Sequence, residues 1–160
     1  MAQLPSPAAD RRWLLEAIEL SRRCPPSESA FSVGALLVAA GDRVLGCGYS
    51  REHDSADHAE EVALARAAGL SSGAGQLAGA TLYSSLEPCA ARASRPVPCA
   101  DLIIAAGVRR VVIAWLEPPL FVPGGGAIRL REAGVEVIVR PDLADAAMAV
   151  NAHLLPGLPA

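Results

Sequence analysis

Three side chains of this chain are of the types that bind a catalytic zinc ion. They are His58, Cys89 and Cys99, and Glu60 lies two positions after the histidine. One imidazole and two thiolates leave a fourth coordination position open, and a neighbouring carboxylate can move protons. The set therefore indicates an enzyme, with Zn2+ as its cofactor.

The order of these residues narrows the chemistry. A His-x-Glu followed by Pro-Cys-x-x-Cys is the signature of zinc deaminases. Here the first half is intact, but nine residues rather than two separate Cys89 from Cys99. In a hydrolytic deamination, Glu60 would take a proton from the attacking water and deliver it to the ring nitrogen and the leaving amine. Ammonia would leave and a carbonyl would remain.

Two other readings of the same residues stay open. A binding or assembly module could keep zinc for stability alone, although such a site has no use for Glu60 and usually has a fourth Cys or His ligand. A thiol-redox protein could use Cys89 and Cys99, although their spacing is not the Cys-x-x-Cys of redox motifs. The remaining cysteines, Cys24 and Cys47, are predicted to be apolar packing residues.

The elements around these residues predict an α/β fold. Two apolar runs joined by a Gly-Asp turn indicate an antiparallel hairpin, and later strands alternate with helices. This order favours a mixed five-stranded sheet covered by helices on both faces, a three-layer α/β/α arrangement. The strands are expected at residues 33–40, 43–49, 81–86, 111–115 and 136–139, and the helices at 10–20, 59–68, 100–106, 127–133 and 143–154.

This arrangement places all three ligands where strands end and helices begin. His58 precedes the second helix, Cys89 follows the third strand, and Cys99 lies at the start of the next helix. Ligands gather at such ends in α/β sheets. His58 must lie at the edge of its helix, because residues two apart on a regular helix point about 200° away from each other.

Composition limits the partners and the compartment. The 160 residues are 52% hydrophobic with a net charge of −3, which predicts one domain and argues against a nucleic-acid groove. No leader and no apolar run of about 18 residues is visible, so we expect a cytoplasmic protein with no membrane contact and reduced thiols. The predicted domain covers residues 10–155. A flexible lead-in is expected at 1–9 and a tail at 156–160. Asp10 is the expected N-cap of the first helix.

Several segments resemble a known family. They are residues 85–89, 96–101, 106–114 and 130–137. They are similar to the deaminase domain of bacterial riboflavin-biosynthesis deaminase/reductase proteins, in the cytidine deaminase-like superfamily. The resemblance implies the cytidine deaminase-like fold, a small heterocyclic substrate and a homodimer. It also implies that the reductase half is absent or supplied by another protein.

The positions that would contact substrate depart from that family. Ala30 replaces an Asn, Ser50 replaces a His, and the segment 117–120 replaces an Asp-Pro-Asn-Pro motif. The loop between the cysteines loses its histidines but keeps two arginines, which could bind a phosphate. We therefore expect an amino-substituted pyrimidine or related heterocycle, free or as a nucleoside or nucleotide. The predicted substrate-binding residues are Ser50, Ala59, Arg92 and Arg95.

Two further carboxylates near the motifs need an interpretation. Glu61 follows Glu60 and is predicted to be a solvated helix residue, so that its replacement should be nearly silent. Glu87 precedes Pro88-Cys89 and is predicted to hold the ligand loop rather than to react.

Overall fold

The computed structural model describes residues 3–70, 75–118, 120 and 124–156. Most of the predicted Gly/Ser connection at 71–75 and of the predicted tail at 156–160 lies outside these residues. No helix within them is long and apolar enough to cross a membrane.

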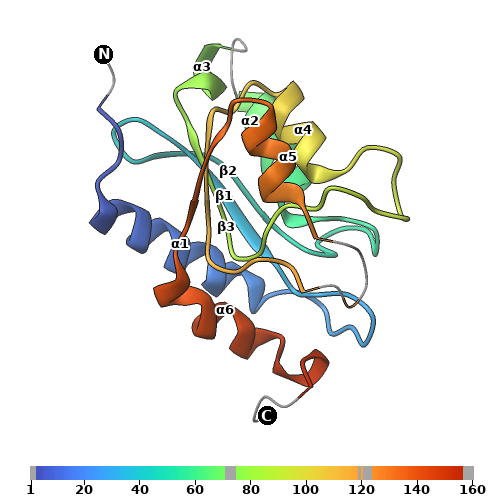
Figure 1. Cartoon of the computed structure of the whole chain (residues 1–160). Helices are drawn as coiled ribbons and strands as arrows, with labels where there is room; N and C mark the ends of the chain where they lie inside the picture. Colours follow the sequence, from blue (N-terminus) through green and yellow to red (C-terminus); the bar gives the residue numbers. More distant parts are fainter. Residues whose placement is uncertain (1–2, 71–74, 119, 121–123, 157–160) are drawn as a thin grey trace.

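A five-stranded sheet forms the centre of the molecule, as predicted (Figure 1). Its strands lie in the order β2-β1-β3-β4-β5, with β1 antiparallel to β2 and β3, and β3, β4 and β5 parallel to one another. The strands are β1 (Gly34–Ala39), β2 (Arg43–Tyr49), β3 (Thr81–Ser84), β4 (Arg110–Ile113) and β5 (Glu136–Val139).

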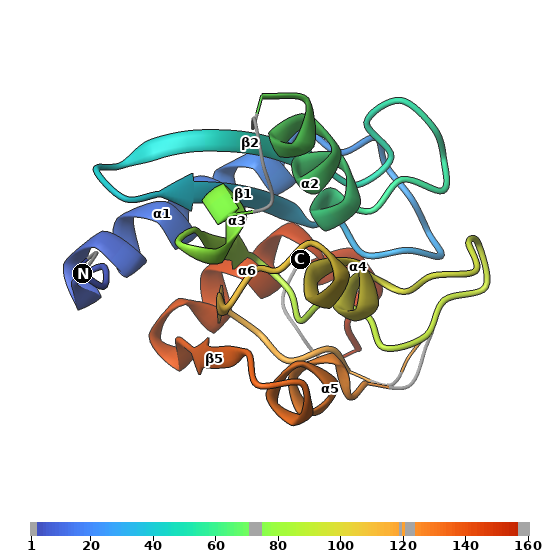
Figure 2. The ribbon, with the colours of Figure 1, turned by 90° about the horizontal axis from the view of Figure 1, so that it is seen from above.

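Helices cover both faces of this sheet (Figures 1 and 2). One face carries α1 (Pro7–Ser21) and α6 (Ala144–Val150), and the other carries α2 (Ala59–Leu70), α4 (Cys99–Ala105) and α5 (Gly126–Glu132). The prediction of three α/β/α layers is therefore confirmed. A short helix, α3 (Gly75–Ala78), was not predicted.

Alternating side chains divide the core into two halves. In β1, Ala35 and Leu37 join the cluster under α2 and α4, whereas Leu36 and Val38 join the cluster under α1 and α6. Successive residues of a strand point to opposite faces, so a strand covered on both faces is apolar along its whole length. This explains why the sequence shows continuous apolar runs here.

The first helix differs from its prediction. It begins at Pro7 and is capped by Ser6, whose Oγ accepts the Ala9 N–H at 3.1 Å, so residues 7–9 belong to the helix. The expected N-cap at Asp10 is wrong. Asp10 is buried in the first turn, and its carboxylate accepts both Nη1 and Nη2 of Arg110 at 2.8 and 2.7 Å and the Tyr83 hydroxyl at 2.8 Å. An acidic residue near a helix start is typical of a cap, but here Asp10 ties α1 to β3 and β4.

The last predicted helix is also shorter than expected. Only Ala144–Val150 is α-helical, between the 3-10 turns Pro141–Leu143 (η1) and Ala152–Leu154 (η2). The buried Asn151 interrupts it, because its side chain accepts the Ser32 N–H at 2.7 Å and donates to the Ser32 carbonyl at 3.0 Å. An amide that bonds to another segment competes with the helix's own pattern.

Close packing at glycine fixes where α2 lies. A Cβ atom added to Gly46 in β2 would lie 2.3 Å from the Ala63 carbonyl oxygen of α2. Only glycine therefore lets the helix axis approach the strand this closely. Because His58 directly precedes α2, this contact also sets the position of the candidate ligand.

We predict that Gly46→Ala lowers the free energy of unfolding by about 1–3 kcal/mol, since the added methyl group must displace α2 backbone. Urea unfolding of the purified variant measures this. Gly69→Ala in α2 is the matched control: nothing lies within 4 Å of its added Cβ, so its stability should be unchanged or higher by up to ~1 kcal/mol. Equal stability of both variants would contradict the close-packing account.

Candidate active site

The three predicted ligands converge in space although they come from three segments. His58 directly precedes α2, Cys89 follows β3, and Cys99 is the first residue of α4. His58 Nδ1 lies 3.6 Å from Cys89 Sγ and 3.4 Å from Cys99 Sγ. All three ligand atoms lie within 4.8 Å of one another.

These distances fit a tetrahedral zinc ion. Zn–N and Zn–S bonds of about 2.0 and 2.3 Å at a tetrahedral angle place the two donor atoms roughly 3.6 Å apart. The observed separations of 3.6 and 3.4 Å are close to this value. An imidazole and two thiolates are also the donors that zinc prefers, so the cluster could hold Zn2+ with one coordination position left for water or substrate.

The pKa values of the two cysteine thiols are shifted in opposite directions. A hydrogen bond from the Cys99 thiol, together with His58 and the Cys99 backbone N–H, lowers the pKa of Cys89 to about 4. The same hydrogen bond and burial raise the pKa of Cys99 well above its ordinary value. One thiolate thus forms readily, and the second proton leaves when a cation neutralises the pair.

Backbone contacts hold the cysteines together. The Cys99 N–H donates to Cys89 Sγ at 3.2 Å, and the Ala100 N–H donates to the Cys89 carbonyl at 3.0 Å. From the other side, α5 begins directly against this turn: a Cβ on Gly126 would lie 1.6 Å from the Pro88 carbonyl oxygen. The ligand turn is therefore fixed by main chain on two sides.

Glu60 lies in the first turn of α2, beside the ligands. Its side chain is buried, and its Oε1 accepts a hydrogen bond from Ser84 Oγ at 2.9 Å. Burial raises the pKa of Glu60, and the nearby His58 opposes this shift. A carboxyl group with a raised pKa can accept and release a proton near neutral pH. Because His58 lies just outside the helix, it and Glu60 can face one site, as the spacing required.

A cavity of about 240 Å³ opens beside these groups. Its wall combines apolar side chains with several charged ones, which is typical of a small-molecule site. Besides His58, Glu60 and Cys89, it is lined by Ser29, Ala30, Phe31, Val33, Ser50, Arg51, Ser55, Ala56, Asp57, Leu86, Glu87, Arg92, Ala93, Ser94 and Glu117.

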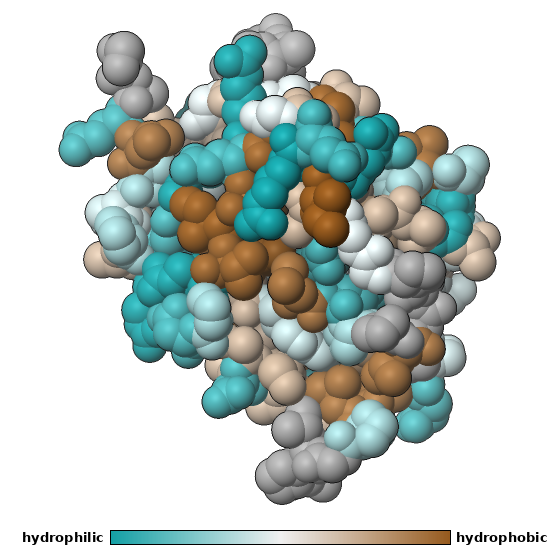
Figure 3. Space-filling view, in the orientation of Figure 1, coloured by the Kyte–Doolittle hydropathy of each residue, from teal (hydrophilic) through white to brown (hydrophobic). Residues whose placement is uncertain are grey.

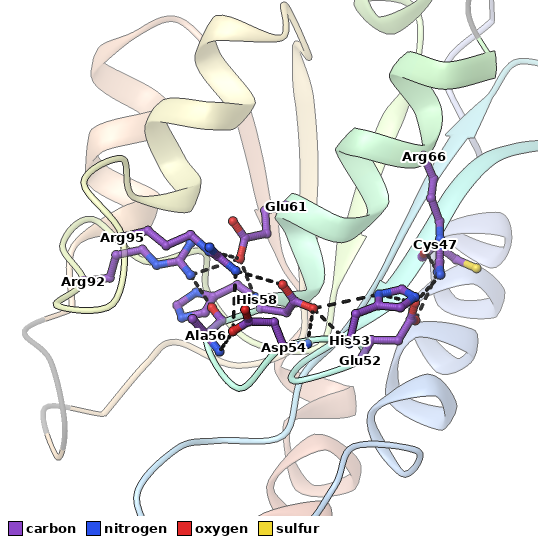
Figure 4. A network of polar contacts seen from close by, with 11 residues as sticks. Cys47, Glu52, His53, Asp54, Ala56, His58, Glu61, Arg66, Arg92 and Arg95 are labelled. Carbon is purple, nitrogen blue, oxygen red and sulfur yellow. Dashed lines mark hydrogen bonds and ion pairs between the residues drawn. The ribbon is translucent and has the colours of Figure 1, made fainter.

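Glu61 is not the solvated residue that was predicted. Its Oε1 accepts the His58 N–H at 2.8 Å, Arg92 Nη2 at 3.0 Å and Arg95 Nε at 3.2 Å (Figure 4). Its side chain is only 17% exposed. Although burial raises the pKa of Glu61, the hydrogen bonds from Arg92 and His58 lower it overall, so the group stays ionised. The premise on which its replacement was expected to be silent is therefore wrong.

The two arginines of the loop are already paired. Arg92 is 2% exposed, also donates to the Ala56 carbonyl, and places Nη1 3.8 Å from Cys99 Sγ. Arg95 donates to Asp57 Oδ1 at 3.0 Å as well as to Glu61. Their guanidinium groups thus fasten the loop between the cysteines to the start of α2. A phosphate would have to compete with these carboxylates.

Of the other two predicted substrate-binding residues, Ser50 lies in the cavity wall and Ala59 does not. Ser50 lines the cavity, and its Oγ accepts the Val33 N–H at 3.1 Å. Ala59 is fully buried in the first turn of α2 and is not part of the cavity wall. Substrate contact by Ser50, Ala59, Arg92 and Arg95 stays a prediction.

Glu87 holds the loops, as predicted. Its carboxylate accepts the Glu117 N–H at 3.0 Å and the Ala127 N–H at 2.8 Å. Sequence reasoning missed Arg51 and Glu117 in the cavity wall. Glu117 gave one signal, since it stands in a segment that departs from the family motif. Arg51 gave none, because it follows an ordinary strand end.

Comparisons with known proteins agree with this geometry. Residues 7–115 match the family model of the cytidine and deoxycytidylate deaminase zinc-binding region. A diaminohydroxyphosphoribosylamino-pyrimidine deaminase of Schizosaccharomyces pombe is 38% identical over 149 residues, covering 92% of this chain and 36% of that protein. The riboflavin biosynthesis protein RibD of Aquifex aeolicus is 44% identical over 109 residues, covering 68% of this chain and 28% of that protein.

Solved structures show the same likeness. A RibD of Acinetobacter baumannii superposes with a TM-score of 0.76 at 34% identity, covering 93% of this chain and 40% of that one. The Aspergillus oryzae Rib2 deaminase, with a TM-score of 0.70 at 24% identity, shares the fold. The chain thus spans less than half of the RibD proteins it matches, and the resemblance read from the sequence is confirmed.

We predict that the purified protein contains about one zinc per chain, and that His58→Ala, Cys89→Ser and Cys99→Ser each lower this content, since each removes one donor from a tetrahedral site. Metal analysis of dialysed protein measures it. Cys24→Ser, which changes a half-buried cysteine outside the cluster, is the control and should keep the metal. Full zinc content in all three ligand variants would refute the assignment.

Proposed function

Because the chain belongs to the cytidine and deoxycytidylate deaminase zinc-binding family, we propose that it is a zinc-dependent hydrolytic deaminase of an amino-substituted pyrimidine or related heterocycle. His58, Cys89 and Cys99 hold the metal in this proposal, and Glu60 moves the proton. The observation that carries it is the buried Glu60 carboxylate in the wall of the same cavity as His58 and Cys89.

The chain's own groups then perform the following tasks. When bound, zinc supplies Lewis acidity that makes water a nucleophile near neutral pH. Glu60 accepts a proton from the attacking water and passes it to the ring nitrogen; it then carries the remaining proton of the added hydroxyl group to the amine, which leaves a carbonyl. A C–O bond forms, the C–N bond breaks, and ammonia leaves. Ser84 holds the Glu60 carboxylate at 2.9 Å, so its position is fixed while its protonation changes.

The substrate belongs to a narrower proposal. The relatives named above include a deaminase of a diaminohydroxyphosphoribosylamino-pyrimidine, which supports a pyrimidine here. The cavity wall, however, has Ala30 and Ser50 where the family has Asn and His, and its Arg92 is engaged by the Ala56 carbonyl and the Glu61 carboxylate. We therefore propose an altered pocket that accepts a different aminated ring.

A zinc-stabilised module without catalysis is the alternative. It would leave unexplained why the buried Glu60 lies in the cavity wall beside the metal ligands, where a proton carrier would have to be. A catalytically idle binding module could use the cavity but would have no use for a proton carrier, and an assembly module would use neither. The deaminase proposal accounts for both features.

We predict that Glu60→Gln keeps its zinc and its thermal stability but loses ammonia release by roughly 100-fold or more, the effect expected when a positioned acid/base is removed. The exposed Glu132→Gln in α5 is the matched control and should keep the wild-type rate. Wild-type turnover by the Glu60 variant would show that another group moves the proton.

We also propose that the protein forms a homodimer. The edge strand β5 pairs only with β4 among the described strands, and its Val137, Ile138 and Val139 are only half buried. Figure 3 shows apolar side chains gathered on this side of the molecule. Exposed apolar surface beside a free strand edge favours association.

Sedimentation equilibrium tests this proposal. We predict a dimer at micromolar concentrations and a shift towards monomer when Val137 in β5 is replaced by Lys, because a charge on an edge strand opposes pairing. A monomer at the highest soluble concentration of the wild-type protein would contradict it.

A further inference from the structure

The segment 25–32, which we call the entry loop, forms one wall of the cavity beside the metal ligands. It joins α1 to β1 and is drawn in light blue between them in Figure 1. Ser29, Ala30 and Phe31 of this loop line the cavity. Residues 25–32 contain no helix or strand, so the position of this wall depends on contacts with neighbouring segments.

Arg51, directly after Ser50, binds both ends of the entry loop. Its Nε and Nη2 donate to the Pro25 carbonyl at 3.1 and 2.7 Å, at the start of the loop. At the end of the loop, Nη1 donates to the Phe31 carbonyl at 3.1 Å and Nη2 donates to Ser32 Oγ at 2.9 Å. These bonds use four of the five N–H groups of the guanidinium. One side chain thus draws the two ends of the loop together.

The backbone at Arg51 has an unusual conformation. Its φ angle is +58°, in the left-handed region that glycine adopts most readily. Its N–H donates to the Asp57 carbonyl at 2.9 Å, which closes the turn that leads to His58. Strain of this kind persists where surrounding contacts over-determine it, and it clusters at functional sites. Arg51 therefore joins the entry loop to the segment that carries the first metal ligand.

The partners of Arg51 differ from those of Arg92, which also lines the cavity. Arg92 pairs with the Glu61 carboxylate, whereas no carboxylate of the described residues forms an ion pair with Arg51. Burial lowers the pKa of Arg51, but a guanidinium stays protonated at ordinary pH. Its charge strengthens bonds to carbonyl and hydroxyl oxygens, and its planar fork decides which of them it reaches at once.

Other side chains hold single points of the entry loop or of its flanks. These contacts are Asn151 with Ser32, His153 with Ser27, and the Cys24 thiol with the Val33 carbonyl. The thiol bond also crosses from the start of the loop to its end, but a thiol is a weak donor. The guanidinium of Arg51 is therefore the main link between the two ends within the described part of the chain.

We propose that Arg51 is a positioning residue. By holding both ends of the entry loop it fixes the cavity wall against which the substrate binds, and it does not act on the reacting atoms. The effect on catalysis rests on the proposed function, whereas the fixation of the loop does not. Loss of the Arg51 side chain should weaken substrate binding and raise KM, while kcat and the zinc content stay near their wild-type values.

Hydrogen exchange of the zinc-loaded protein tests the fixation of the loop without a substrate. Arg51→Gly removes the guanidinium and suits the left-handed backbone, so the fold should be kept. We predict that amides of residues 27–33 exchange roughly 10-fold or more faster in this variant, because charge-assisted hydrogen bonds are lost, while those of β3 and β4 are unchanged. Guanidinium chloride at non-denaturing millimolar concentration should slow this exchange again, and sodium chloride should not.

Arg140→Met is the control for the exchange experiment. Arg140 also donates to a distant backbone carbonyl, that of Pro7 at 3.0 Å, but it does not line the cavity. Its replacement should leave the exchange of residues 27–33 at the wild-type rate.

Ammonia release measures the consequence for binding, with 4-aminopyrimidine, cytosine, cytidine and cytidine monophosphate as probes. For each compound that the wild-type protein deaminates, Arg51→Gly should raise KM by roughly 10-fold or more and leave kcat within about threefold. Guanidinium chloride should lower KM again. Arg51→Lys keeps the charge but not the planar fork, so its KM should stay raised.

The outcomes separate positioning from other roles. Wild-type exchange of residues 27–33 in Arg51→Gly, or a loss of kcat at unchanged KM, would overturn the proposal. Faster exchange throughout β3 and β4 would also overturn it, because Arg51 would then support the whole fold. A wild-type KM in Arg51→Lys while the loop still exchanges fast would show that the charge itself contacts the substrate. Absence of ammonia release from every compound would instead refute the proposed function, and the exchange experiment would still decide whether Arg51 fixes the loop.

Discussion

The site depends on one half-buried carboxylate, Glu61. It accepts the backbone N–H of His58 and the guanidinium groups of Arg92 and Arg95, so a single group holds both the start of α2 and the loop that separates the two cysteines. Charge-assisted hydrogen bonds of this kind are about twice as strong as neutral ones. Together with the bonds from Arg92 to the Ala56 carbonyl and from Arg95 to Asp57, they hold the nine-residue loop between Cys89 and Cys99 against the start of the helix that carries Glu60. The metal ligands converge because this carboxylate and the close packing at Gly46 and Gly126 leave the three segments little freedom.

The acidic groups near the site differ in pKa because their surroundings differ. Glu61 is ionised because arginines surround it, whereas the pKa of Glu60 and of Glu117 is raised by burial. Glu61 thus anchors the loop, and the raised pKa of Glu60 suits the proton carrier of the proposed function. The loop arginines are part of the anchor, which explains how the family's loop histidines can be lost here without loss of the loop's position.

Sequence patterns predicted the sheet, its mixed direction and the meeting of His58, Cys89 and Cys99, because ligand types and apolar periodicity are local signals. They failed where a side chain bonds to a distant segment. Asp10 looks like a helix cap but binds Arg110 and Tyr83, and Glu61 looks like a surface residue but binds arginines more than 30 positions away. Burial of a charge depends on loop conformation, which no local pattern encodes. The sequence predicts only part of the cavity wall: it indicates Ser50 and Arg92, whereas Glu117 differs from a motif without showing that it lines the cavity.

The central claim is that this zinc cluster and cavity deaminate an aminated ring. The most direct test is ammonia release from a panel of aminopyrimidines, aminopurines and their nucleosides and nucleotides, measured on the zinc-loaded protein, on the chelated protein and after zinc is restored. The account predicts release from at least one compound, its loss on chelation and its return with zinc. Zinc bound at full occupancy with no ammonia from any compound, or release that persists after chelation, would contradict it.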